Sequence, residues 1–200
     1  MDASSWNERY AAADLVWSLA PNAFVVEELS DLPPGRALDL AAGEGRNALW
    51  LAERGFEVEA VEFSPVAIDK ARQLASHRGL ELTLTLADLT DPSPPPLAPA
   101  DLVLLAYLHL PRAAEAEVLR HAAAWVAPGG TLLVVAHARR NLTEGVGGPQ
   151  DPTLLPTPTE VTEALAGTGL VIDRAEEVTR EVEDQPRPAI DVLVRAHRPR

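Results

Sequence analysis

The segment LDLAAGEGRNALWLA, residues 38–52, constrains the fold of this chain more than any other stretch. A short apolar run leads into two closely spaced glycines, Gly43 and Gly45, and a helical pattern of apolar residues follows directly. Glycines lack Cβ atoms, so the backbone of such a turn can approach a ligand closely, and the following helix offers free N–H groups. The segment predicts a strand, a tight turn and a helix, which together begin a parallel α/β unit.

The same alternation of strand and helix runs along most of the chain. Five expected strands are separated by helices or loops, and two more are joined by the short link EDQPR into a hairpin. This pattern predicts an α/β fold: a Rossmann-like, doubly wound, mostly parallel seven-stranded sheet with a C-terminal antiparallel hairpin. The expected strands are residues 36–41, 56–62, 80–88, 101–108, 131–138, 170–182 and 188–198.

Helix and loop signals fill the spaces between these strands. Residues 14–29 predict one or two helical segments with a break near Pro21, and the helix after the glycine turn is expected to continue through Arg54. The best-marked helix has Ser64 as its N-cap and Gly79 as its terminator. Further helices are expected at residues 112–126 and 159–166, a semi-rigid proline-rich connection at 91–99 and a long irregular loop at 141–158.

Composition limits the classes of protein to which the chain can belong. The 200 residues carry a formal net charge of −13, and they include a single lysine and no cysteine. Because acidic charge repels phosphate backbones, we expect no nucleic-acid partner. The missing cysteines exclude disulfides and thiolate metal sites. No apolar stretch approaches a membrane span, and the first residues do not resemble a signal peptide, so we expect a cytoplasmic protein without a membrane partner.

Two acids beyond the glycine turn indicate a ligand that contains adenosine. Glu62 closes the second expected strand, where a carboxylate can accept hydrogen bonds from both ribose hydroxyls. Asp88 ends the third expected strand, where a carboxylate can accept a hydrogen bond from the exocyclic amine of adenine. Ligands of parallel sheets lie beyond the carboxyl ends of the strands, so we expect these acids and the glycine turn to share one site.

The charge of Asp39 distinguishes between two adenosine cofactors. This residue lies at the tip of the first expected strand, four positions before Gly43, where a nicotinamide dinucleotide would bring its pyrophosphate. A carboxylate repels phosphate charges but attracts the ammonium and sulfonium groups of S-adenosylmethionine. The sequence therefore favours S-adenosylmethionine over NAD.

The chain resembles class I S-adenosylmethionine-dependent methyltransferases in five segments: LDLAAGEGRN, VEFSP, LAD, DLVLLAYLHLP and APGGTLLV. The segment GEGRNALWLA is similar to the tellurite-resistance and thiopurine-type branch of small-molecule methyltransferases. The resemblance covers roughly residues 6–198. It implies that a small-molecule acceptor takes the methyl group of S-adenosylmethionine by in-line displacement, with S-adenosylhomocysteine as product and no metal.

The resemblance also implies a set of cofactor-binding residues. Asp39 and the glycine turn would hold the methionine moiety of the cofactor. Glu62, after the second strand, would hold the ribose, and Asp88 and Leu89, after the third strand, would contact the adenine. Tyr10 and Arg46 would lie near the cofactor carboxylate. Ala41 stands where the family has its first glycine, which narrows the turn by one methyl group. The implied residues are Tyr10, Asp39, Ala41, Gly43, Gly45, Arg46, Asn47, Glu62, Phe63, Asp88, Leu89 and Ala106.

One methyltransferase domain is expected over residues 1–200. It would consist of an N-terminal helical lid (1–34), a cofactor-binding core (35–138) and a region with the substrate loop, a helix and the hairpin (139–200). We expect the N-terminal segment and the loop at 141–158 to form the lid and the acceptor pocket. Such loops are typical places for binding residues.

Two histidines are candidate catalytic bases. His109 follows the fourth expected strand and His137 lies near the end of the fifth, and an acceptor that must lose a proton early needs a base. Each can equally be a buried histidine that is hydrogen-bonded to the backbone. The histidines of this sequence do not have the spacing of a metal site.

Two other functions stay open at this point. An NAD-dependent oxidoreductase would share the glycine turn, but Asp39 and the terminal hairpin argue against it. A non-catalytic protein that binds S-adenosylmethionine would share the whole cofactor signature. Only turnover separates that protein from an enzyme.

Overall fold

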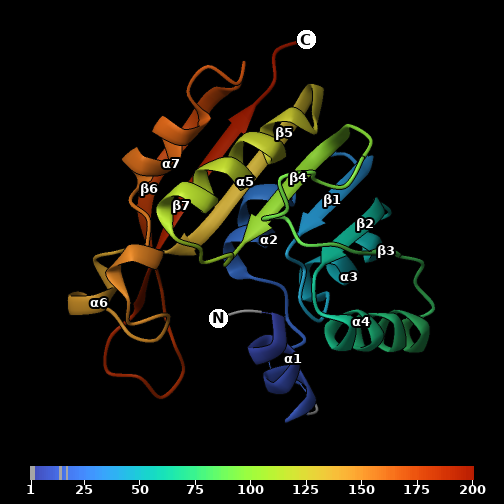
Figure 1. Cartoon of the computed structure of the whole chain (residues 1–200), viewed down its shortest axis with the longest axis horizontal. Coiled ribbons are helices and arrows are strands. Elements are labelled where there is room, and N and C mark those ends of the chain that lie inside the picture. Colours follow the sequence, from blue (N-terminus) through green and yellow to red (C-terminus); the bar gives the residue numbers. More distant parts are fainter. Residues whose placement is uncertain (1–2, 14, 17) are drawn as a thin grey trace. The chain divides into compact units, whose positions relative to one another are not determined.

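The structure is a computed structural model that describes residues 3–13, 15–16 and 18–200 (Figure 1). The chain forms two compact units, Met1–Pro96 and Leu97–Arg200, and their boundary falls in the predicted proline-rich connection. The strands follow the order β3-β2-β1-β4-β5-β7-β6 in a seven-stranded sheet. The pairs β1–β2, β2–β3 and β4–β5 are parallel, whereas β7 pairs antiparallel with β5 and β6. These pairings confirm the predicted Rossmann-like fold.

The first unit contains a parallel arrangement of three strands with helices packed on it. Its strands are β1 (Arg36–Leu40), β2 (Glu57–Glu62) and β3 (Thr83–Leu86). Helix α3 (Arg46–Glu53) packs on β1 and β2, and α4 (Pro65–Arg78) packs on β2 and β3. β1 is buried from its second residue onward, as the apolar strands of parallel sheets are when helices cover them.

Two short helices precede β1. They are α1 (Ala3–Ala11), which lies beside α4 (Figure 1), and α2 (Ala23–Leu29). The side chain of Asn22 caps α2 by accepting the backbone N–H groups of Phe24 and Val25. In the part of the chain that the structure describes, no helix combines the length and apolar character needed to cross a membrane.

The predicted helix at residues 14–29 is right only in its second half. Residues 15–16 and 18–20 are not helical, while Asp14 and Trp17 lie outside the described residues. The backbone N–H of Val16 donates to the carboxylate of Glu44 at 3.0 Å, so a distant side chain takes the place of a helical partner. Long-range contacts of this kind override a local helical pattern.

The end of α4 determines where β3 begins. Gly79 adopts the left-handed conformation, with φ of 65°, and terminates the helix as predicted. The backbone N–H of Leu80 still donates to the carbonyl of Ala75 at 2.9 Å, which closes the last helical turn. The predicted strand at residues 80–88 is therefore too long, and β3 occupies only its centre.

The second unit combines a parallel strand pair with the C-terminal hairpin. Helix α5 packs on β4 and β5, and α7 packs on β6 and β7 and against α5 (Figure 1). The capping box at Thr157 and Glu160 fixes the start of α7. The elements are β4 (Ala100–Ala106), α5 (Arg112–Ala124), β5 (Val126–His137), α7 (Pro158–Leu165), β6 (Val171–Arg180) and β7 (Ala189–His197).

β5 begins earlier than predicted, and α5 ends earlier. The backbone N–H of Ala100 donates to the carbonyl of Trp125 at 2.8 Å, which draws the chain into the sheet directly after the helix. Residues 127–130 already belong to β5, and the pairing of β4 and β5 has an irregularity beside them. A bulge accommodates Gly129, whose φ is 82°.

The loop at 141–158 has more structure than predicted. It contains the short helix α6 (Asn141–Glu144) and a single 3-10 turn at Pro152–Leu154. The buried side chain of Asn141 accepts the backbone N–H of Ile190 at 2.7 Å and donates to the carbonyl of Gly147 at 2.9 Å. One asparagine thus fixes the start of the loop against β7.

Candidate functional site

The turn after β1 has the backbone geometry that a close approach to a ligand requires. Ala41, Gly43 and Gly45 all adopt positive φ values, of 56°, 57° and 83°. The backbone N–H of Ala42 donates to the carbonyl of Val61 at 3.0 Å, which connects the turn to β2. Gly45 is the N-cap of α3 and provides no side-chain hydrogen bond to it. The first turn of α3 therefore has N–H groups that no capping side chain occupies.

Asp39 carries a buried carboxyl group that is short of partners. Its Oδ2 atom is buried and has no hydrogen-bond partner among the described residues. Burial raises the pKa of Asp39 to about 7. A hydrogen bond from the backbone N–H of Ala48 and the positive charge of Arg46 lower this pKa, whereas the negative charge of Glu62 raises it. A buried carboxylate that lacks partners favours a nearby cation.

Glu62 connects the end of β2 to the glycine turn. Its buried carboxylate accepts the backbone N–H of Gly43 at 2.9 Å on Oε2 and that of Ser64 at 3.0 Å on Oε1. Burial raises the pKa of Glu62, backbone hydrogen bonds lower it, and the charge of Asp88 raises it. The backbone of Phe63 is a third donor, so of the four lone pairs of the two carboxylate oxygens one is left for a further donor.

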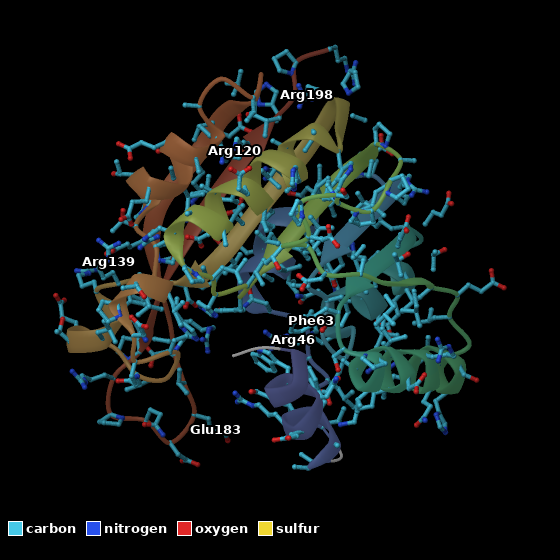
Figure 2. The ribbon with its side chains drawn as sticks, viewed as in Figure 1. Arg46, Phe63, Arg120, Arg139, Glu183 and Arg198 are labelled. Carbon is cyan, nitrogen blue, oxygen red and sulfur yellow. The ribbon has the colours of Figure 1, made fainter. Side chains whose placement is uncertain are left out.

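The residues after β2 and β3 provide a polar and an apolar surface. Asp88 is exposed, and its Oδ1 accepts the backbone N–H and the hydroxyl of Thr90 at 2.8 and 2.7 Å. Leu89 is buried and Phe63 is half-buried (Figure 2). The effect of Asp88 on the pKa of Glu62 means that these two carboxyl groups lie near each other, as the sequence predicts.

Tyr10 brings α1 to the glycine turn. The tyrosine is buried, and its ring stacks on that of Trp6 with 5.4 Å between the ring centroids. A Cβ atom added to Gly43 would lie 2.9 Å from the Tyr10 hydroxyl oxygen. The predicted proximity of Tyr10 to the turn is thus present, while its contact with a cofactor stays a prediction.

Lys70 and Glu44 hold the N-terminal segment in place, and neither was predicted from the sequence. The Lys70 ammonium donates to the carbonyls of Tyr10 and Ala13, both at 2.6 Å, and lies 2.9 Å from the buried carboxylate of Glu44. Glu44 in turn accepts the backbone N–H of Val16. The fact that Lys70 is the single lysine of the chain is the signal that could have drawn attention to it.

Arg46 and Asn47 open α3, but they have different surroundings. Arg46 is half-buried (Figure 2), and its charge acts on the pKa of Asp39. Asn47 is buried, and its Oδ1 accepts the backbone N–H of Asn22 at 2.9 Å, which connects α3 to the cap of α2. The structure therefore shows Asn47 in a contact that holds α3 and the start of α2 together, and its role in cofactor binding stays a prediction.

A second polar cluster lies in the second unit, around Asp191 of β7. The Tyr107 hydroxyl donates to Asp191 Oδ2 at 2.7 Å, and Arg180 Nε lies 3.3 Å from the same oxygen. His137 Nδ1 lies 2.9 Å from Asp191 Oδ1. We call Tyr107, His109, His137, Arg180 and Asp191 the Asp191 cluster. Asp191 is the one acid of the otherwise apolar run AIDVLV, and this pattern could have identified it from the sequence.

The two predicted histidines have different partners. His109 Nε2 accepts the backbone N–H of His137 at 3.3 Å, and the two rings stack with an interplanar angle of 13°. Burial lowers the pKa of His109 to about 4, with a further lowering by His137, while Asp191 and a backbone hydrogen bond with Tyr107 act in the opposite direction. His109 is thus a neutral imidazole occupied by backbone groups. Its role as a base, like that of His137, stays a prediction.

Ala106 is the last residue of β4 and directly precedes Tyr107. The cofactor contact predicted for Ala106 stays a prediction. Among the residues that the structure describes, no group of three metal-ligating side chains occurs.

The chain is similar in sequence to known methyltransferases. Residues 37–130 match the methyltransferase domain family. The chain is 36% identical over 125 residues to demethylmenaquinone methyltransferase of Thermus thermophilus, covering 62% of this chain and 54% of that protein. It also matches Hemagglutinin 1 of Eikenella corrodens, with 27% identity over 55% of this chain and 37% of that protein. The chain thus spans about half or less of the length of these relatives.

Solved structures show the same fold over most of the chain. TehB from Haemophilus influenzae has a TM-score of 0.74 and 19% identity, covering 90% of this chain and 63% of that one. A structure from the conversion of a disulfide bond into a thioacetal group during echinomycin biosynthesis has a TM-score of 0.70 and 26% identity, covering 90% and 82%. Together with the domain match, they confirm the resemblance to class I S-adenosylmethionine-dependent methyltransferases. The division into lid, core and substrate region stays a prediction.

The backbone of Ala41 predicts an unusual gain in stability. Replacing Ala41 with glycine is expected to raise the free energy of unfolding by about 1 kcal/mol, because a side chain at positive φ is strained and glycine is not. Ala42, whose φ is not positive, is the control: Ala42→Gly should lower the free energy of unfolding. Urea unfolding of both variants checks this, and equal effects would contradict the assignment of strain.

The contact between Gly43 and Tyr10 predicts a selective loss of cofactor binding. Gly43→Ala is expected to weaken S-adenosylmethionine binding at least about tenfold, because the new methyl group displaces the buried Tyr10 ring. Gly79→Ala is the matched control, since Gly79 has a similar positive φ and its Cβ would meet open space. Titration calorimetry measures both affinities, and a similar loss in the two variants would show that only backbone strain matters.

Proposed function

We propose that this chain transfers the methyl group of S-adenosylmethionine to a small-molecule acceptor. The observation that carries the proposal is the buried Asp39 carboxyl with its unpartnered oxygen beside the glycine turn. S-adenosylmethionine provides an ammonium and a sulfonium group, and such cations match a buried carboxylate. The sequence relatives and the domain match support the same reaction.

The residues of the first unit fit the parts of this cofactor. Glu62 has a lone pair left for a ribose hydroxyl, and Asp88 has a second carboxylate oxygen for the adenine amine. Phe63 and Leu89 offer apolar surface for the adenine ring. We assign the methionine moiety to Asp39 and to the turn, with Tyr10 and Arg46 at its carboxylate. Asn47 and Ala106 complete the proposed set.

The chemistry of the proposed reaction needs little from the protein beyond alignment. When bound, the cofactor supplies a methyl carbon that its sulfonium already makes reactive. The protein holds the acceptor in line with that carbon and excludes water, which is the kind of contribution that proximity and orientation make. The remaining task is the removal of a proton from acceptors that carry one.

A small molecule is the acceptor that the charge of the chain favours. The net charge of −13 opposes binding to nucleic-acid phosphates. The Thermus thermophilus relative is named for the methylation of demethylmenaquinone, a small molecule. We propose a cytoplasmic enzyme on the basis of the sequence.

Two competing functions remain, and binding and turnover separate them. An NAD-dependent oxidoreductase would place phosphate charges near Asp39 and should bind NAD in calorimetry. A non-catalytic binding protein would bind S-adenosylmethionine and S-adenosylhomocysteine without producing methylated acceptor. Tight binding of NAD with no response to the other two compounds would overturn the proposal.

The raised pKa of Asp39 predicts that cofactor binding depends on pH. Between its ordinary pKa of 3.8 and about 7, Asp39 keeps a proton in the folded protein that the unfolded chain has lost. A cationic ligand favours the ionised form, so binding should release this proton. The affinity for S-adenosylmethionine is expected to rise with pH from about pH 5.5 to 7, by at most about tenfold per pH unit.

Calorimetry in buffers of different ionisation enthalpy measures both the affinity and the proton released. Asp39→Asn should bind at least about tenfold more weakly and release fewer protons. Its unfolding gives an independent check: the wild type loses the contribution of Asp39 to stability as pH rises from about 4 to 7, and the variant does not. Affinity that does not change with pH in the wild type would contradict the role of Asp39.

A further inference from the structure

The strand register of the second unit brings three polar residues to one face of the sheet. His137, the last residue of β5, pairs across the antiparallel ladder with Asp191 of β7. Asp191 in turn pairs with Val178 of β6, and Arg180 lies two residues further along the same strand face. Directly paired residues project their side chains from the same face. The topology itself therefore assembles the carboxylate, the imidazole and the guanidinium.

Asp191 is fully buried, and its Oδ2 has hydrogen-bond partners, whereas Oδ1 lies 2.9 Å from His137 Nδ1 without the angles of a formed hydrogen bond. Oδ2 accepts the Tyr107 hydroxyl and lies near Arg180 Nε, while Oδ1 faces His137 Nδ1. Burial and the charge of Asp191 raise the pKa of Tyr107, so this hydroxyl keeps its proton and donates it. Arg180 offsets the buried negative charge. The carboxylate is thus held rigidly, with one oxygen aimed at the imidazole.

The contact with Asp191 determines which nitrogen of His137 can act as a base. A carboxylate at Nδ1 favours the tautomer that carries its proton there, which leaves the lone pair of Nε2 free to take a proton. The other charged group of the cluster is Arg180, which lies beside Asp191 Oδ2. The rings of Tyr107 and His109, which are neutral, lie against the ring of His137. His109 occupies the backbone N–H of His137 and stacks on its ring, so the imidazole has one orientation.

The backbone around His137 is strained and close-fitting. Tyr107 has a φ of 61°, which is rare for a bulky residue, and such outliers concentrate at functional sites. A Cβ atom at Gly148 would lie 2.6 Å from His137 Cδ2. The loop that carries Gly148 is hydrogen-bonded to Asn141 through the carbonyls of Val146 and Gly147. Several independent elements thus fix one imidazole at the carboxyl end of β5.

We propose that His137 removes the proton from a methyl acceptor that carries an O–H or S–H group, and that Asp191 is its positioning residue. The inference rests on the proposed function. The proton moves to Nε2 of His137, the acceptor lone pair forms the bond to the methyl carbon, and the electron pair of the broken C–S bond stays on sulfur. His137 then returns its proton to solvent. A neutral amine has a free lone pair and would not need such a base.

Imidazole ¹⁵N NMR of the full chain without cofactor tests the positioning of His137, with His137→Gln to assign its signals. At about pH 8, the wild type is expected to carry the His137 proton on Nδ1 and none on Nε2. Asp191→Asn should shift both signals, and Tyr107→Phe should shift them less. Asp173→Asn is the matched control, because Asp173 lies 2.8 Å from His197 Nδ1 in an exposed pair of the same kind. His137 signals that are unchanged in Asp191→Asn would overturn the role of Asp191.

Methyl transfer from labelled S-adenosylmethionine to catechol, benzyl mercaptan and aniline tests the acceptor class. Catechol or benzyl mercaptan, which both keep their proton near neutral pH, should be methylated, and His137→Gln should slow that reaction about 100-fold or more with unchanged cofactor affinity. Gly148→Ala should slow it too, whereas Gly167→Ala should not, because both glycines have positive φ but only a Cβ at Gly148 would meet His137, while a Cβ at Gly167 would meet open space. Which of the two compounds reacts distinguishes a hydroxyl from a thiol acceptor.

Two outcomes would contradict the role of His137 even if the protein binds S-adenosylmethionine. One is methylation of aniline alone, and the other is methylation of catechol or benzyl mercaptan that is insensitive to His137→Gln. If cofactor binds but none of the three compounds reacts, the acceptor class is wrong. Absence of S-adenosylmethionine binding would instead overturn the proposed function, and the NMR result on His137 would stand separately.

Discussion

The hydrogen bond from the Gly43 N–H to the Glu62 carboxylate connects the parts of the first unit to which we assign the proposed cofactor site. The same carboxylate accepts the N–H of Ser64, whose hydroxyl caps α4. One buried acid thus fixes the turn after β1, the end of β2 and the start of α4 relative to each other. Each hydrogen bond to a charged group contributes about 1.5–3 kcal/mol, and losing the acid would leave buried N–H groups without partners. Burial disfavours the ionised form of Glu62 and raises its pKa, and the backbone hydrogen bonds offset part of this desolvation cost.

Sequence reasoning identified the features of this site that depend on local signals. The turn with Gly43, the cap at Ser64 and the acids at strand ends follow from short motifs and from the rule that parallel strands present their carboxyl ends at one edge. The contacts of Lys70 with Glu44 and of Tyr107 with Asp191 join residues 26 and 84 positions apart. The second contact depends on the register of β5 and β7, and a shift of one residue would turn Asp191 to the other face. Nothing in the local pattern determines that register.

Backbone strain appears at corresponding places in the two units. Ala41 is the first residue after β1 and Tyr107 is the first residue after β4, and both have positive φ. Such a conformation costs about 1–3 kcal/mol for a non-glycine residue, so the surrounding contacts must impose it. The N–H of Tyr107 donates to the carbonyl of Val135, and that of Ala42, next to Ala41, donates to that of Val61. In each case the chain turns sharply while its backbone is still hydrogen-bonded to the neighbouring strand.

Two pairs of aspartate and histidine, one within the C-terminal hairpin and one between β7 and β5, share their chemistry but not their surroundings. His197 and Asp173 are each about 40% exposed, whereas Asp191 is fully buried and His137 is 13% exposed. Water screens the exposed pair, so its contact contributes little and holds the ring weakly. The buried pair lies in a medium of low dielectric constant, and its carboxylate has further partners that prevent it from turning away. Only the buried pair can therefore keep an imidazole in one tautomer and one orientation, which is what proton removal from an acceptor requires.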